Sequence, residues 1–199
     1  MAYKRGFKKQ AHAVASEVRA ELELGPLDLL DPFALASHLA VPVIPLSVLS
    51  SEVPQAVAHF LHGTPESFSA VTVFRGLRRI IVYNDAHVLG RQHSDVAHEL
   101  SHALLLHEPQ AAFGEGGCRN WNADHEDEAN FLAAALLVSE EAALDVVRRG
   151  IGLRQAAAAY GVTPKLMQWR INATGARKRV ERSRRFQRSP GRQTDSSRR

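Results

Sequence analysis

The motif H-E-x-x-H at residues 98–102 constrains this chain most, because it sets His98 and His102 four residues apart. On an α-helix such residues lie on one face within a few ångströms, so their imidazoles can bind one tetrahedral Zn²⁺ at about 2.0–2.1 Å each. Glu99 lies one step round the helix, where its carboxylate can reach a water activated by the metal without binding the metal itself. The motif predicts a helix over about residues 94–107, with Glu99 as general base. The alternative is a helix with two incidental surface histidines, and a third ligand decides between them.

The third ligand of such a site comes from further along the chain. Metalloproteases with the longer motif H-E-x-x-H-x-x-G-x-x-H need glycine at 105 and histidine at 108, but this chain has Leu105 and Glu108. The other solution is a glutamate from a following helix, which gives a His₂Glu site with water in the fourth position. Residues 124–137 predict such a helix, with an acidic first turn and an Ala/Leu-rich second half.

Two glutamates on this predicted helix compete for the metal. Glu126 and Asn130 are four residues apart and share one face. Glu126 is therefore the favoured ligand, and Asn130 is placed to hydrogen-bond a ligand side chain from behind, whereas Glu128 points elsewhere. A simpler explanation, that acidic residues favour a helix N-terminus through its dipole, accounts for Asp124, Asp127 and Glu128. It does not explain why the acidic turn leads an apolar helix just downstream of the histidines.

The remaining pattern predicts an α+β fold with a small antiparallel or mixed sheet. β-Branched and aromatic residues at 69–74 and 78–83 are typical of a hairpin. An extended segment is predicted at 41–45, where two prolines exclude a helix. The order of helices, strands and helices indicates one domain over residues 8–175. Helices are predicted over about 8–24, 32–39, 94–107, 124–137, 139–149, 153–160 and 163–173.

The charge is divided unevenly between the body and the C-terminal end. The chain carries a net charge of +4, but residues 176–199 hold ten arginines and lysines against two acidic residues. This segment therefore carries +8, which leaves −4 for residues 1–175. Its Ser, Arg, Gln, Gly and Pro content predicts a basic, disordered tail. The alternative is a tail that makes weak contact with nucleic acid.

The cysteine and hydropathy patterns predict a cytoplasmic chain that makes no membrane contact. Cys118 is the only cysteine, so no intramolecular disulfide can form, which suits a reducing compartment. No stretch approaches the ~18 uncharged apolar residues of a membrane span, and the basic N-terminus is not followed by the apolar segment of a signal peptide. Cys118 lies in a Gly-rich loop, where a free cysteine without function is favoured over a redox or metal-capping role.

Together these motifs resemble the ImmA/IrrE family of metallopeptidases. In that family a strand precedes H-E-x-x-H, and the pattern E-x-x-A-N-x-x-A-A-x-L-L follows it. The same order occurs here at residues 79–84, 95–106 and 126–137. The resemblance covers roughly residues 10–175 and implies that the sheet packs against a zincin-like helical core.

The resemblance carries the roles of the family's site residues onto this chain. The residues that match the family's zinc ligands and its general base are, in that order, His98, His102, Glu126 and Glu99. Two positions depart from the family pattern. Ser101 stands where the family usually has Gly, and Val138-Ser139 stands where it usually has Met-Pro. Neither departure removes a catalytic group.

The resemblance also implies a function. Members of the family are associated with site-specific cleavage of helix-turn-helix repressors, which induces mobile-element or stress-response genes, so we expect a zinc-dependent endopeptidase with such a substrate. An extended substrate can pair with an exposed strand, and both 69–74 and 78–83 are candidates. Two other classes stay open. One is a catalytically silent, metal-bearing regulator, and the other is a DNA-binding protein that acts through the helix-turn-helix-like segment and basic tail of residues 153–199.

Two further histidines flank the predicted metal helices. His107 ends the first predicted helix and His125 lies in the first turn of the second. Each is placed either to stabilise the oxyanion of a tetrahedral intermediate or to remain a solvated polar residue, and the sequence leaves both roles open.

Overall fold

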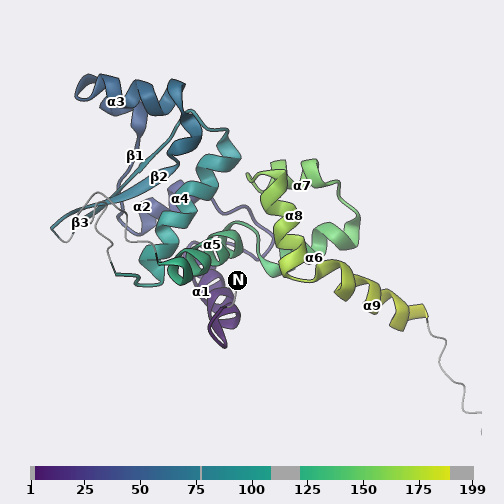
Figure 1. Ribbon diagram of the computed structural model, residues 1–199. Helices are drawn as coiled ribbons and strands as arrows, with labels where there is room; N and C mark the ends of the chain where they lie inside the picture. Colours follow the sequence, from purple (N-terminus) through teal and green to yellow (C-terminus); the bar gives the residue numbers. More distant parts are fainter. Residues whose placement is uncertain (1–2, 77, 109–121, 189–199) are drawn as a thin grey trace, which may run out of the picture.

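The computed structural model describes residues 3–76, 78–108 and 122–188, which form a small sheet, a helical body around it and a C-terminal group of helices (Figure 1). The predicted α+β class is confirmed. The predicted loop cysteine, Cys118, lies outside the described residues. The strands are β1 (Val43–Pro45), β2 (Ala70–Arg75) and β3 (Arg78–Tyr83). The helices are α1 (Phe7–Glu21), α2 (Pro32–His38), α3 (Pro54–Ala58), α4 (Leu89–Leu104), α5 (Ala123–Leu137), α6 (Glu140–Arg149), α7 (Leu153–Ala159), α8 (Pro164–Ala173) and α9 (Ala176–Arg188), with short 3₁₀ or π turns η1 (Leu46–Ser51), η2 (His59–Gly63) and η3 (Pro65–Ser67).

The sheet is mixed and has the strand order β1-β3-β2. β1 runs parallel and β2 antiparallel to the central β3, and Thr72 lies opposite Ile81 in the β2–β3 hairpin. Ile81 is fully buried, and helix α4 packs against both β2 and β3. Of the predicted hairpin strands, β3 is therefore internal, and β2 is an edge of the sheet among the described residues.

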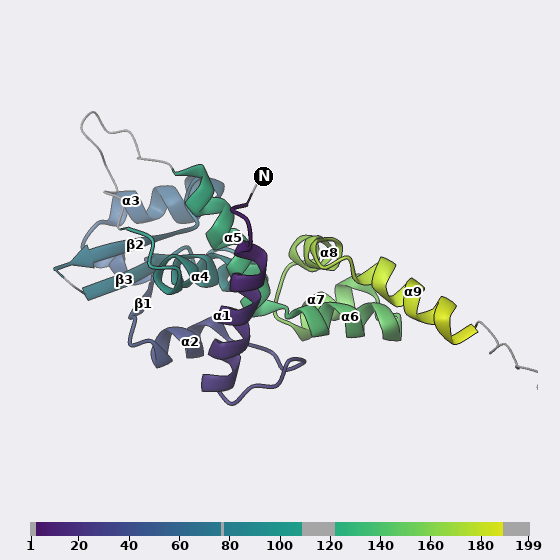
Figure 2. The same cartoon turned by 90° about the horizontal axis from the view of Figure 1, so that it is seen from below.

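Helices α4 and α5 pack against each other at the centre of the molecule. α4 buries Val96, Ala97 and Leu100, and every residue of α5 from 131 onward is buried. α1 lies along α5 on the side away from the sheet (Figure 2). α4 begins at Leu89, earlier than predicted, because its N-cap Val88 makes no side-chain cap that would mark the start in the sequence.

Two buried arginines hold the C-terminal end of α5. Arg19 of α1 donates from Nη2 to the carbonyl of Leu136 at 2.8 Å, and Arg170 of α8 donates from Nε to the carbonyl of Val138 at 2.7 Å. The last carbonyls of a helix have no partner within it and carry its negative dipole end, so cations stabilise them. Burial lowers the pKa of Arg170 to about 10, which still leaves it charged at neutral pH. These bonds join α1 and the C-terminal helices to the helix that carries the predicted metal ligand.

The C-terminal helices form a second apolar cluster that extends from the end of α5 (Figure 2). Within it, α9 corrects the prediction of a tail without regular structure from residue 176, because residues 176–188 are helical. Ala176 and Val180, four residues apart, are buried in this helix, which packs on α6. Composition did not predict this helix because two buried apolar residues are outnumbered by arginines, although together they form the side of α9 that faces the protein. Residues 189–199 of the predicted tail lie outside the described part of the chain.

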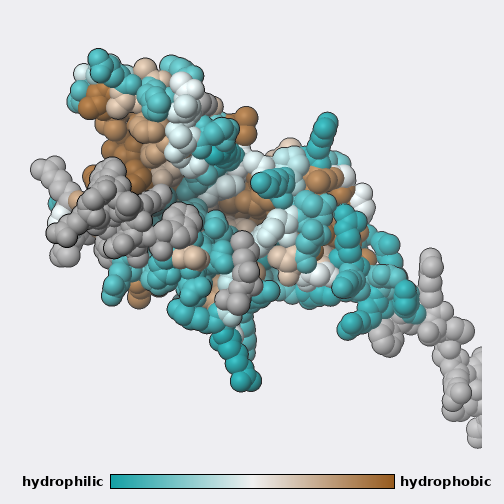
Figure 3. All heavy atoms as spheres, viewed as in Figure 1, coloured by the Kyte–Doolittle hydropathy of each residue, from teal (hydrophilic) through white to brown (hydrophobic). Residues whose placement is uncertain are grey.

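Apolar and polar side chains cover different parts of the surface. Figure 3 shows apolar side chains gathered over the end of the molecule that carries the sheet, whereas polar side chains cover most of the C-terminal helices. The exposed apolar residues of β2 are Val73 and Phe74. Among the described helices, none has the length and apolar character needed to cross a membrane.

Candidate metal centre

Three potential ligands from two helices converge at the α4–α5 interface. His98 and His102 project from one face of α4, and Glu126 projects toward them from the first turn of α5. Nε2 of His98 lies 3.1 Å from Nε2 of His102 and 3.3 Å from a carboxylate oxygen of Glu126. The other oxygen of Glu126 lies 3.7 Å from Nε2 of His102. The residues predicted from i,i+4 spacing and from the following acidic turn therefore lie together.

The donor set fits a tetrahedral zinc ion. Ligands bound to zinc at about 2.0–2.1 Å lie roughly 3.3 Å apart along the edges of a tetrahedron. The separations of 3.1 Å between the two histidines and 3.3 Å between His98 and Glu126 are close to this value, whereas the 3.7 Å separation from His102 is to the other oxygen of Glu126. Two imidazole nitrogens and one carboxylate are also the ligand types that zinc takes in hydrolytic sites with an open fourth position. Geometry and donor chemistry agree, whereas the role of each residue as a ligand remains a prediction.

The local charges favour metal binding by His102 at neutral pH. Burial and the neighbouring His98 lower the pKa of His102 to about 4, so this imidazole keeps a lone pair for a metal. Burial also lowers the pKa of His98, but the hydrogen bond to Glu126 and the charges of Glu99 and Glu126 outweigh it and leave the pKa raised. A divalent cation between these groups would replace the proton that the site favours on His98.

Glu99 lies apart from this cluster and faces the sheet. Its side chain is buried, and its Oε2 accepts a hydrogen bond from Oγ1 of Thr72 at 2.5 Å. Thr72 lies in the middle of the edge strand β2. The carboxylate predicted as general base is thus held between α4 and the strand. Sequence reasoning missed Thr72, because nothing in a strand pattern tells which of its side chains meets a helix 27 positions later.

Asn130 and Glu128 of α5 contact different partners, as the helical spacing predicts. Asn130 Oδ1 lies 3.0 Å from Nδ1 of His98, on the side opposite Glu126. Glu128 points away from the cluster and lies 3.2 Å from Nε2 of His107 and 3.6 Å from Nζ of Lys4. Glu126 is therefore the glutamate of α5 that lies with the histidines.

His107 occupies neither of the positions considered for it from the sequence. His107 is 7% exposed in its side chain, so it is not a solvated residue, and its Nδ1 lies 2.9 Å from Nδ1 of His102. It contacts the far side of the ligand ring and not the open side of the centre. The ring of His125 stacks on that of His107 at 4.2 Å and an interplanar angle of 7°. The sequence signal that could have indicated this contact is the position of His107 just after the motif, at the end of the predicted helix.

The two departures from the family pattern have local structural roles. Ser101 is fully buried and donates to the carbonyl of Ala97 at 2.7 Å, within α4. Ser139 caps α6 by accepting from the backbone N–H of Ala142, and donates to the carbonyl of Pro26. Both side chains are thus engaged away from the three converging ligands.

Comparison with known proteins agrees with this geometry. The sequence profile described as the IrrE N-terminal-like domain, Peptidase_M78, matches residues 46–172. The match includes the sheet hairpin, both helices of the candidate centre and most of the C-terminal helices. A search of curated proteins gave no match. The profile covers well over half of the 199 residues and supports a metallopeptidase type of activity. The chain therefore belongs to the IrrE N-terminal-like family of peptidases.

Proposed function

We propose that this chain is a zinc-dependent endopeptidase whose metal is held by His98, His102 and Glu126. The observation that carries the proposal is the convergence of the three groups, with Nε2 of His98 3.1 Å from Nε2 of His102 and 3.3 Å from a carboxylate oxygen of Glu126, both close to the edge length of a zinc tetrahedron. Membership of a peptidase family supports the same conclusion.

The proposed reaction divides the work between the metal and Glu99. A zinc ion bound at this site supplies Lewis-acid polarisation of the scissile carbonyl and lowers the pKa of the attacking water. Glu99 accepts a proton from that water and later returns it to the leaving amine. The hydroxyl of Thr72 holds the carboxylate in place through the hydrogen bond to Oε2. The other oxygen of Glu99 is then the one that accepts the proton.

The edge strand β2 is the proposed docking site for the substrate backbone. Its outer edge has no strand partner among the described residues, and Thr72 on it contacts the proposed general base. An extended peptide that adds to this edge would run past Glu99. The exposed side chains of Val73 and Phe74 offer apolar contacts to such a peptide. β1 is the other edge, but β3 separates it from β2.

The proposed substrate is a helix-turn-helix transcriptional repressor, and the proposed setting is the cytoplasm. The substrate proposal rests on the resemblance to ImmA/IrrE peptidases. The proposed compartment rests on the single cysteine of the chain. Cleavage would then induce mobile-element or stress-response genes.

The substrate assignment is tested by incubating the zinc-loaded chain with the repressor encoded by the neighbouring gene. We expect two fragments whose masses sum to the repressor plus one water, and no fragments with Glu99→Gln or after chelation. An intact repressor that nevertheless forms a stable complex with the chain would instead identify a silent regulator. Cleavage that persists in Glu99→Gln would reject the proposed mechanism.

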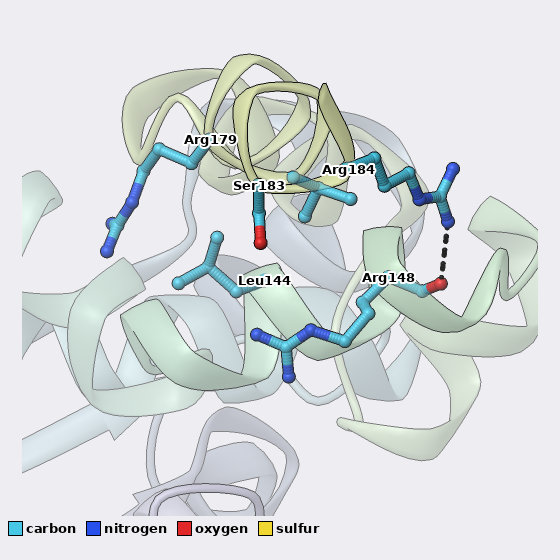
Figure 4. Close-up of a pocket in the computed structure, with 6 residues that line it drawn as sticks. Leu144, Arg148, Arg179, Ser183 and Arg184 are labelled. Atoms are coloured by element: carbon cyan, nitrogen blue, oxygen red, sulfur yellow. Dashed lines mark hydrogen bonds between the residues drawn. The ribbon is translucent and has the colours of Figure 1, made fainter. Parts of the chain in front are cut away.

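We also infer a second, weaker activity, contact with nucleic acid through α9. The exposed cations Arg177, Lys178 and Arg182 of α9 make no ion pair with any other described residue. Beside α9, a shallow cavity of about 280 Å³ is lined with further polar groups (Figure 4). Those groups are the side chains of Arg148, Ser183, Arg184 and Arg179, of which Arg179 is ion-paired with Glu140, and Leu144 and Val180 complete the lining. Clustered arginines and lysines of this kind bind phosphates by releasing counterions.

Charge-reversal variants distinguish nucleic-acid contact through α9 from contact through the helix-turn-helix-like segment. We expect the double variant Arg177→Glu/Lys178→Glu to weaken binding of a fluorescent 20-base-pair duplex about tenfold or more, and to reduce the salt slope by about two. The matched control, Arg154→Glu/Lys165→Glu, reverses two exposed cations on α7 and α8 and should bind normally. Fluorescence anisotropy over a salt series measures both. A larger loss in the control would assign the contact to α7–α8.

A further inference from the structure

A line of four side chains leads from the candidate metal centre to the exposed side chain of Lys4. Nδ1 of His102 lies 2.9 Å from Nδ1 of His107, and Nε2 of His107 lies 3.2 Å from Oε2 of Glu128. The other oxygen of Glu128 lies 3.6 Å from Nζ of Lys4. The side chains of His107 and Glu128 are 7% and 9% exposed. These contacts lie on the side of the His102 ring opposite the atom that faces Glu126.

The chemistry of these groups allows one consistent arrangement of hydrogens. An ionised carboxylate only accepts, so the Nε2 of His107 that faces Glu128 must carry a hydrogen. In the neutral ring Nδ1 is then an acceptor, and it faces Nδ1 of His102 at hydrogen-bond distance. His102 must therefore carry its hydrogen on Nδ1. Its Nε2 is left with a lone pair, directed at the point shared with His98 and Glu126.

The backbone after α4 is shaped to bring His107 into this position. The helix ends with N–H bonds from Leu106 to the carbonyl of Ala103 and from His107 to the carbonyl of His102, with Leu106 at a φ of 54°. This is a Schellman ending, which turns the chain back so that the side chains three residues before and two after the cap residue meet. Those residues are His102 and His107. A leucine in the left-handed region is strained, and Leu106 is 87% exposed, so packing of its side chain does not offset the strain.

The ring of His107 is also fixed in its plane. His125 stacks on it at 4.2 Å and 7°, so a ring flip, which would move Nδ1 away from His102 and Nε2 away from Glu128, would have to occur within the stack. His98 is held more simply, because Asn130 Oδ1 accepts directly from its Nδ1 at 3.0 Å. Nδ1 of each motif histidine thus faces an acceptor, which is Oδ1 of Asn130 for His98 and Nδ1 of His107 for His102.

From this geometry we infer that His107, held by Glu128, is a positioning residue that fixes His102 in the tautomer competent for metal binding. This inference rests on the proposed metal centre but assigns a new role to two residues outside it. Hydrogen-bonded partners behind a ligand typically change metal affinity 10–100-fold. Glu128, which does not join the ligand cluster, acquires its function through this line of contacts.

The tautomer is tested first in the unaltered, metal-free protein. Long-range ¹H–¹⁵N correlation spectra of histidine-labelled protein distinguish Nδ1–H from Nε2–H rings. We expect His102 in the Nδ1–H form and His107 in the Nε2–H form. The Nε2–H form at His102 would overturn the inference, and this measurement does not depend on any variant folding or on zinc being the metal.

Matched variants then test the effect on metal binding. His107→Phe keeps a ring of similar size but removes the acceptor, and we expect its zinc dissociation constant, measured by chelator competition, to rise 10–100-fold. His107→Asn places Oδ1 near the position of Nδ1, and should stay within about threefold of wild type. Likewise, Glu128→Leu should bind zinc more weakly than Glu128→Gln, whose amide oxygen can still accept from His107. Asp124→Leu, on the exposed first turn of the same helix, should bind zinc as tightly as wild type.

The outcomes separate this inference from the proposed function. Equal zinc affinity for wild type and His107→Phe, or equal loss in His107→Phe and His107→Asn, would overturn the positioning role. Failure of the wild type itself to bind zinc would instead overturn the proposed metal centre, and the tautomer spectrum would still decide the role of His107.

Discussion

Replacing Glu99 with glutamine is expected to lower the cleavage rate about 10²–10⁴-fold while leaving the zinc content unchanged, because the amide cannot accept the proton of the attacking water. Glu99 does not belong to the converging ligand group, and its carboxylate is bound to Thr72. Glutamine can keep that hydrogen bond through its amide oxygen, so the side chain stays in place and only proton transfer is lost. Single-turnover cleavage of the repressor, with zinc content measured on the same sample, checks both parts.

The matched control for this variant is Glu17→Gln, which makes the same chemical change on the exposed face of α1. It should cleave at the wild-type rate. Undiminished cleavage by the Glu99 variant would assign proton transfer to another group. Loss of zinc from it would mean that Glu99 supports the metal and would leave its catalytic role without support.

Replacing Glu126 with alanine is expected to weaken zinc binding by at least 10²-fold, since it removes the carboxylate from the three proposed ligands. Glu128→Ala should cost about tenfold, because Glu128 acts on His102 only through His107. Chelator competition on both variants gives the ranking. The reverse ranking would reassign the third ligand to Glu128 and the supporting role to Glu126.

The three proposed ligands could be located from the sequence because each relation between them is local or follows from helix pairing. The spacing of His98 and His102 sets one helix face, and that of Glu126 and Asn130 sets another. The apolar halves of the two helices then require the helices to pack against each other. The observed contacts His98–Glu126 and His98–Asn130 follow from these constraints.

What the sequence did not predict depends on contacts that no periodicity encodes. Thr72 meets Glu99 because α4 packs across β2 as well as β3, and this packing was not readable from the hairpin signal. His107 reaches His102 through a left-handed turn at Leu106, where glycine or asparagine is the usual signal. Among the described side chains of α9, the buried apolar ones are those of Ala176 and Val180, and they stand in a segment whose composition is typical of disorder.

The central claim is that one zinc ion is shared by α4 and α5, and anomalous diffraction at the zinc absorption edge tests it most directly. Crystals of the zinc-loaded protein should give one strong peak at about 2.0–2.1 Å from Nε2 of His98, Nε2 of His102 and a carboxylate oxygen of Glu126. A peak elsewhere in the molecule, or no peak from protein that cleaves its substrate, would contradict the account.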